Sequence, residues 1–306
     1  MLRKILFQGR KMNLTLVRDN LQLLDDNSDY FNSNEVLNDP EGSRLPSIIV
    51  IGALYLIILL ILPIVVFASE ATHTHETTPP KKMQWPFEGA FGVVDRQAAQ
   101  RGFQVYKEVC STCHALKHLY YRNLKEIGFS EGEIKEIAKN YQVIDGPNEE
   151  GEMFERPAIL SDHFVSPYKN DQAARAANNG GLPVDLSLIV KARGDGANYV
   201  YSLLTGYEEA PADFKLNPGS YYNKYFPGHQ IAMTQPLVVD GQVAYEDGTN
   251  ATIDQMAHDL VVFLQWAAEP EMEHRKSMGL KVLMFLSVFT VVFYIAKKRV
   301  WSNLKK

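Results

Sequence analysis

Two long apolar runs stand out from a chain that otherwise mixes apolar and polar positions. Residues 48–67 carry no charge, and residues 278–296 carry only Lys281, near their beginning. A helix rises ~1.5 Å per residue, so either run is long enough to cross a hydrocarbon core of about 30 Å. The pattern predicts a C-terminal transmembrane anchor at 278–296, and a signal sequence or an N-terminal transmembrane helix at 47–68.

The first run allows two interpretations. Val66 and Ala68 have the small-residue spacing of a signal-peptidase site, which favours cleavage, but a retained anchor is also compatible. Either way, the residues that follow are expected to be exported. Residues 1–46 form a polar extension whose many acidic side chains argue against a mitochondrial transit peptide. Residues 69–84 are polar, contain two prolines and are expected to be a linker.

Apolar positions at helical spacing predict two longer helices in a domain spanning residues 85–275. The first covers 95–110, with Asp95 as its N-cap, and its apolar face includes Phe103 and Tyr106. Gly102 lies on the same face, where a glycine costs about 1 kcal/mol relative to alanine. We therefore expect a close helix crossing there, with the late helix 252–268 as the partner.

The region between these helices is rich in Pro, Gly and Asn. Short helices are expected at 130–140, 171–178, 185–191 and 198–204, the first of them with a capping box formed by Ser130 and Glu133. Residues 145–155 read as an acidic loop.

The C-terminal residues 297–306 are basic. They include Lys297, Lys298, Arg299, Lys305 and Lys306. The positive-inside rule places this tail on the cytoplasmic or matrix side and the domain 85–275 on the opposite side of the membrane. The net charge of the whole chain is −5, which argues against a nucleic-acid partner.

The sequence Cys110-Ser111-Thr112-Cys113-His114 is the motif with the clearest chemistry. C-x-x-C-H is typical of c-type haem attachment, in which two thiols add to the porphyrin vinyl groups and the histidine binds the iron. A zinc site would need further good ligands, and the chain contains only two cysteines. A thioredoxin-like motif would need a βαβ context. We therefore expect one covalent haem c per chain, on the non-cytoplasmic side.

The second axial ligand decides between two classes of protein. Met233 lies in a proline-bracketed loop before the late helix, and His229 is a rival four residues earlier. A filled sixth position suits electron transfer, whereas an open position suits an enzyme or a gas sensor. A membrane-tethered cytochrome c that feeds an oxidase is a third possibility.

Several long stretches resemble the cytochrome c1 family. They are GFQVYKEVCSTCHAL at 102–116, DGPNEEGEMFERP at 145–157, AARAANNGGLPVDLSLIVKARGDGANYVYSLLTGY at 173–207, YFPGHQIAM at 225–233 and LQWAAEPEMEHRKSMGLKVL at 264–283. The resemblance implies a mainly α, class I-like c-type cytochrome domain with long loop insertions. It also implies His114 and Met233 as axial ligands, together with a haem environment that includes Arg193, Tyr199, Asn178 and Pro183. Arg193 and Tyr199 are implied near the haem propionates. The family often carries His-Gly-Gly where this chain has Gly194-Asp195-Gly196, which affects only local loop detail.

The resemblance implies an electron carrier of the respiratory bc1 complex. Its partners are then cytochrome b, the Rieske iron–sulfur protein as donor and cytochrome c as acceptor, with no catalytic site in this chain. The acidic loop is a candidate docking patch for a basic cytochrome c, through Asp145, Glu149, Glu150, Glu152 and Glu155. The expected location is a bacterial inner membrane with the haem domain in the periplasm, a mitochondrial inner membrane being the alternative.

Overall fold

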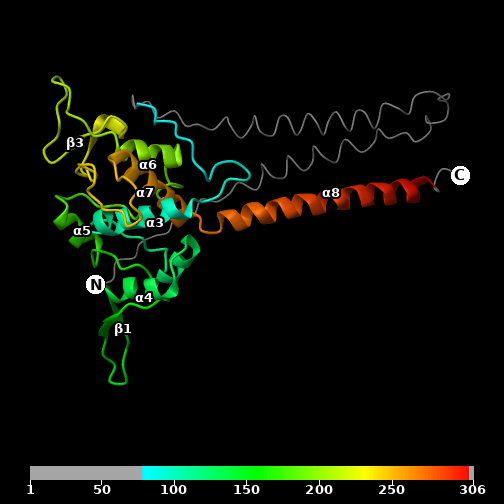
Figure 1. Ribbon diagram of the computed structural model, residues 1–306, viewed down its shortest axis with the longest axis horizontal. Coiled ribbons are helices and arrows are strands. Elements are labelled where there is room, and N and C mark those ends of the chain that lie inside the picture. The colour runs from blue at the N-terminus through cyan, green and yellow to red at the C-terminus, as the bar shows by residue number, and fades with distance from the viewer. Residues whose placement is uncertain (1–77, 303–306) are drawn as a thin grey trace, which may run out of the picture. The chain divides into compact units, whose positions relative to one another are not determined.

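The structure is a computed structural model, and it describes residues 78–302. The expectations for residues 1–46 and 47–68, the first part of the linker 69–84 and residues 303–306 lie outside the described residues. The described part is mainly α-helical, as the sequence predicts, with two short antiparallel strand pairs (Figure 1).

The helix that leads to the cysteines begins as predicted and ends differently. Helix α3 spans Arg96–Val105, and the Asp95 carboxylate caps it by accepting hydrogen bonds from the backbone amides of Gln97 and Ala98. The chain then continues as a π-helical turn, η1, over Tyr106–Cys110, where the sequence predicts regular α-helix. The amide of Ser111 donates to the carbonyl of Tyr106, which closes this wider turn.

Helix α7 spans Ile253–Ala268 and packs against α3 (Figure 1). Gly102 lies at their crossing, where an added Cβ would lie 2.0 Å from the carbonyl oxygen of Asp259 and 2.7 Å from the Cβ of Phe263. The predicted close crossing is therefore confirmed, and it leaves no room for a side chain at position 102.

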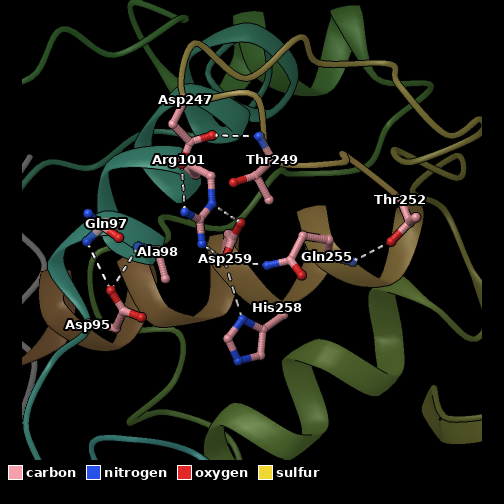
Figure 2. A network of polar contacts seen from close by, with 10 residues as sticks. All are labelled: Asp95, Gln97, Ala98, Arg101, Asp247, Thr249, Thr252, Gln255, His258 and Asp259. Atoms are coloured by element: carbon pink, nitrogen blue, oxygen red, sulfur yellow. Dashed lines mark hydrogen bonds and ion pairs between the residues drawn. The ribbon is translucent and has the colours of Figure 1, made fainter.

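A buried polar network holds the two helices together at this crossing (Figure 2). The Asp259 side chain is 0% exposed, and it accepts from the Nε of Arg101 at 2.7 Å and from the amide of Gln255 at 2.9 Å. Arg101 also pairs with Asp247 at 2.9 Å. The buried carboxylate is thus compensated by charge and by hydrogen bonds, as a buried charge must be.

The remaining elements of the domain are short. They are η2 (Tyr121–Ile127), α4 (Glu131–Lys139), β1 (Gln142–Asp145), β2 (Phe154–Pro157), α5 (Asp171–Ala177), α6 (Gly196–Leu204), β3 (Tyr221–Tyr222), η3 (Pro227–His229) and β4 (Gln230–Ile231). The helices expected at 130–140, 171–178 and 198–204 are confirmed, and so is the reciprocal capping box of Ser130 and Glu133.

One expectation needs correction. The short helix expected at 185–191 is wrong, because residues 185 and 186 lie outside regular structure and residues 187–191 form hydrogen-bonded turns. Asp185 is used elsewhere, since its side chain accepts from the amides of Lys117 and Ser187. The acidic loop expected at 145–155 is largely confirmed and lies at the end of a hairpin: residues 146–153 are outside the strands, and β1 and β2 pair from Gln142–Pro157 to Asp145–Phe154.

The C-terminal helix α8 spans Met272–Ser302 and is long and apolar enough to cross a membrane. Its apolar side chains are exposed from Met278 onward. Its first turn is attached to the domain through Glu273, which pairs with Arg96 at 2.8 Å and accepts from the amide of Val94 at 2.8 Å.

Candidate haem site

The C-x-x-C-H segment begins at Cys110, the last residue of η1, and turns tightly. The amides of Cys113 and His114 both donate to the carbonyl of Cys110, at 3.1 and 2.8 Å. The Tyr106 hydroxyl donates to the carbonyl of His114 at 3.0 Å. These contacts place both thiols and the imidazole on one turn at the end of the helix pair.

The Cys110 thiol is buried and Cys113 is partly exposed. Burial, and to a lesser extent the Cys113 side chain, raises the pKa of Cys110 to about 12. Within residues 78–302, no group of three His, Cys, Asp or Glu side chains is arranged to hold a metal ion.

The His114 ring is oriented by a backbone carbonyl. Its Nδ1 lies 2.7 Å from the carbonyl oxygen of Val184, so Nδ1 carries the proton and Nε2 keeps a free lone pair. Burial lowers the pKa of His114, an effect partly offset by this hydrogen bond and by Asp185. A neutral imidazole with a free Nε2 is the form that binds iron.

The Val184 segment is fastened to the residues that follow the motif. The amide of Leu186 donates to the carbonyl of Ala115 at 2.9 Å, and the amide of His118 donates to the Ser187 hydroxyl at 3.1 Å. This pairing brings Pro183 and Val184 beside His114. The exposed apolar side chains of the same segment suit the face and edge of a porphyrin; they are Leu182, Val184 and Leu188.

Asn178 is connected to the cysteines through a tyrosine. Its amide nitrogen lies 3.0 Å from the hydroxyl oxygen of Tyr168, and that hydroxyl lies 3.9 Å from the sulfur of Cys113. The following Gly181 lies against the Met233 loop, because a Cβ at Gly181 would lie 3.6 Å from the Cβ of Ala232. The structure therefore brings the segment 178–184 between the C-x-x-C-H turn and the methionine loop.

Met233 is half-buried, and its carbonyl accepts a hydrogen bond from the Tyr207 hydroxyl at 3.0 Å. Burial, and then the neighbouring Tyr199, raises the pKa of Tyr207, so Tyr199 lies nearby. Burial raises the pKa of Tyr199. The positive charge of the exposed Arg193 lowers that pKa by a smaller amount, so Arg193 lies near Tyr199.

Tyr207 is a functional residue that no sequence pattern singles out. It is the last residue of the 173–207 stretch, but nothing in its spacing marks its hydroxyl as a support for Met233. For His229, the rival ligand, the Nδ1 is 3.0 Å from the carbonyl oxygen of Lys224, and the ring stacks on Tyr222.

These donors fit a covalently bound haem. The site contains two thiols on one turn, an imidazole with a free Nε2, an apolar wall and a loop that carries a thioether. Together with α8, the fold and the site define a membrane-anchored c-type cytochrome.

Comparison with known proteins agrees. Residues 85–304 match the Cytochrome C1 family. The chain is 49% identical over 240 residues to cytochrome c1 of Rhodospirillum rubrum, covering 73% of this chain and 88% of that protein. It is 44% identical over 276 residues to "Cytochrome c1 1, heme protein, mitochondrial" of Arabidopsis thaliana, covering 90% and 88%. It is also 47% identical over 246 residues to "Cytochrome b/c1" of Bradyrhizobium diazoefficiens, covering 73% of this chain and 36% of that longer protein. The chain belongs to the cytochrome c1 family.

Proposed function

We propose that His114 and Met233 hold the iron of the haem c through which this chain carries electrons in the bc1 complex. The carrier function and the covalent haem follow from the family. The family also favours this function over an open-site haem enzyme, a gas sensor or a tethered cytochrome c that feeds an oxidase. The ligand assignment is our own, and the His114–Val184 hydrogen bond is the observation that carries it.

Each residue of the site has a distinct role in this proposal. Cys110 and Cys113 form the two thioether bonds. His114 binds through Nε2, while Val184 fixes its ring, and Met233 supplies a neutral sulfur ligand. When bound, the haem supplies a reversible one-electron couple, and a thioether ligand favours its ferrous state.

Two charged or polar groups are proposed to face the propionates. The Arg193 guanidinium makes only a long 3.4 Å contact to its neighbouring carbonyl of Ala192 among the described residues, so it remains available for a carboxylate. Tyr199 is half-buried beside it. Asn178 and Pro183 are proposed to line the pocket, Asn178 through its contact with Tyr168.

As a subunit of the bc1 complex, the chain has cytochrome b and the Rieske protein as partners. We propose that it takes an electron from the Rieske centre and passes it to cytochrome c. Helix α8 anchors it in the membrane. The basic residues at its end, Lys297, Lys298 and Arg299, support an orientation with the haem domain on the periplasmic side.

We propose a smaller docking patch for cytochrome c than the whole acidic segment. Asp145 forms an ion pair with Arg156, which also pairs with Asp162 at 2.6 Å, so the Asp145 carboxylate is already engaged within the domain. The acidic side chains on the rest of the hairpin are exposed; they are Glu149, Glu150, Glu152 and Glu155. We therefore assign the steering charge to these four residues.

The ligand proposal is tested with Met233→Leu, and Met153→Leu on the exposed hairpin is the matched control. We expect Met233→Leu to retain covalent haem, to show a lower reduction potential and to bind carbon monoxide in the ferrous state. Met153→Leu is expected to match the unsubstituted protein in all three. An unchanged potential in Met233→Leu would remove Met233 as the ligand. Carbon monoxide binding by the unsubstituted protein would instead support the open-site alternative.

A further inference from the structure

The segment before α3 exposes an unusual pair of apolar side chains. Phe91 is 82% exposed and Val93 is 53% exposed, whereas the neighbouring Trp85 and Phe87 are buried and stacked on each other. The stacked pair Trp85 and Phe87 therefore attaches this segment to the core. Phe91, in the same loop 87–93, is not covered by any of the described residues.

This loop is fixed to the beginning of the membrane helix. The Lys276 ammonium donates to the carbonyl of Phe87 at 2.7 Å and to the carbonyl of Gly92 at 3.0 Å. Glu273 holds the next residues, through the amide of Val94 and the guanidinium of Arg96. Figure 1 shows the segment before α3, in cyan, running close to the point where α8 begins.

The attachment point coincides with the start of the apolar surface of α8. The exposed apolar side chains of that helix begin at Met278, two residues after Lys276. At ~1.5 Å per residue, Lys276 lies about 3 Å along the helix axis from Met278. The loop 87–93, which is attached at Lys276, therefore lies at the same depth along α8 as the expected boundary between water and lipid.

We propose that the loop 87–93 is a second membrane contact, in which Phe91 and Val93 insert into the lipid interface beside α8. Lipid is the favoured occupant because the loop continues the membrane surface that α8 already defines. The Lys276 ammonium, held by two carbonyls at this level, occupies the position in which lysine side chains are tolerated at membrane boundaries. A two-point contact of this kind would fix the tilt of the haem domain on the bilayer, which a single helix does not do.

The test uses site-directed spin labels on the full, haem-loaded chain. Its only two cysteines are consumed by the haem, so an introduced cysteine is the single free thiol. Labels are placed by Phe91→Cys and by Val93→Cys, and the chain is reconstituted in vesicles of phosphatidylcholine and phosphatidylglycerol. The collision rate of each label with oxygen, which partitions into lipid, is compared with its collision rate with a water-soluble nickel chelate. The same sample under nitrogen serves as the baseline for both rates.

Two exposed positions calibrate the measurement. Met153→Cys, on the hairpin and 60% exposed, reports the aqueous reference, and Phe285→Cys, on α8 and 62% exposed, reports the lipid reference. We expect the oxygen-to-nickel ratio at positions 91 and 93 to exceed the Met153 value severalfold and to lie between the Met153 and Phe285 values, because Phe285 lies deeper along α8. A ratio equal to that at Met153 would overturn the proposal.

A second measurement covers the assembled complex. Phe91 is replaced by the photoreactive benzoylphenylalanine, and the products of irradiation are identified by mass spectrometry. Lipid adducts are expected. A dominant adduct with another subunit would show that protein, and not lipid, covers the loop, and would overturn the proposal.

Discussion

The hydroxyl of Tyr207 donates a hydrogen bond to the backbone carbonyl of Met233 at 3.0 Å. Tyr207 follows α6, whereas Met233 lies in the loop after β4, so this bond helps to tie the methionine loop to the helical part of the domain. Buried hydrogen bonds of this kind contribute about 1 kcal/mol.

Tyr207→Phe is expected to loosen Met233 without changing the covalent attachment of the haem. A loss of about 1 kcal/mol corresponds to a roughly fivefold faster displacement of the sulfur by an external ligand. The rate of cyanide binding to the ferric protein measures this displacement. Tyr221→Phe, an exposed tyrosine of β3, serves as the control. Equal rates in the two variants would show that the hydrogen bond does not restrain Met233.

Gly102→Ala is expected to separate α3 from α7. The added methyl would lie 2.0 Å from a backbone carbonyl that cannot move away easily, so we expect a loss of at least about 3 kcal/mol in the free energy of unfolding. Gly132→Ala in α4 is the matched control, because its Cβ would meet only the Ser130 hydroxyl at 3.9 Å. That substitution is expected to stabilise by up to about 1 kcal/mol. Thermal unfolding of both variants, followed by circular dichroism, measures the contrast.

Asp259→Asn is expected to cost about 3 kcal/mol of unfolding free energy, since it removes one partner of a buried ion pair while Arg101 keeps Asp247. Asp195→Asn, which breaks the exposed pair with Lys82, is expected to change stability little. Denaturant unfolding of the two variants makes the comparison. A loss in Asp259→Asn as small as in Asp195→Asn would mean that the buried network contributes little.

The same carboxylate predicts a pH dependence. Burial disfavours the charged form of Asp259, but hydrogen bonds from His258, Arg101 and Gln255 outweigh it and lower the pKa below its ordinary 3.8. A lowered folded-state pKa contributes stability above the unfolded value, and this contribution is lost as the pH falls through the folded value. The stability difference between the unsubstituted protein and Asp259→Asn should therefore be constant at neutral pH and shrink below about pH 3.8. A difference that persists unchanged in acid would assign the effect to packing.

The acidic hairpin predicts an effect on the rate of electron transfer. Replacing Glu149, Glu150 and Glu152 with glutamine should weaken the dependence of cytochrome c reduction on ionic strength, because steering by exposed charges is screened by salt. The control removes the same charge from a neighbouring surface, by glutamine at Glu126, Glu131 and Glu136. Stopped-flow reduction over a range of salt concentrations distinguishes the two triple variants. Identical salt profiles would exclude the hairpin as the docking surface.

Much of this fold can be predicted from the sequence because the features that determine it involve residues close together in the chain. Caps such as Asp95 and Ser130, the apolar faces of α3 and α7, and the apolar run of α8 each depend on residues close together in the chain. Gly102 revealed the helix crossing because a glycine in the middle of a helix requires a reason. The C-x-x-C-H motif is also local, and its spacing of two thiols and an imidazole is the one that covalent haem attachment requires, so it predicts the cofactor.

The rest depends on contacts between distant residues. Val184 orients His114 through a backbone carbonyl, which any residue type at position 184 would offer, so no pattern marks it. Tyr207 supports Met233 through a hydroxyl that spacing does not single out. The expected helix at 185–191 failed because Asp185 and Ser187 bond to residues 117 and 118 instead. Asp259 did leave a signal, as the lone carboxylate in the most apolar part of its helix.

Each of the two proposed ligands is held by a hydrogen bond: the ring of His114 by the Val184 carbonyl, and the backbone of Met233 by the Tyr207 hydroxyl. Groups that are already in place need not move when the charge beside them changes, and the energy of that rearrangement is what limits the speed of electron exchange between fixed partners. The two hydrogen bonds would therefore lower the reorganisation energy of the iron couple. The chain would then speed electron transfer by keeping the two iron ligands nearly stationary when the iron changes its oxidation state.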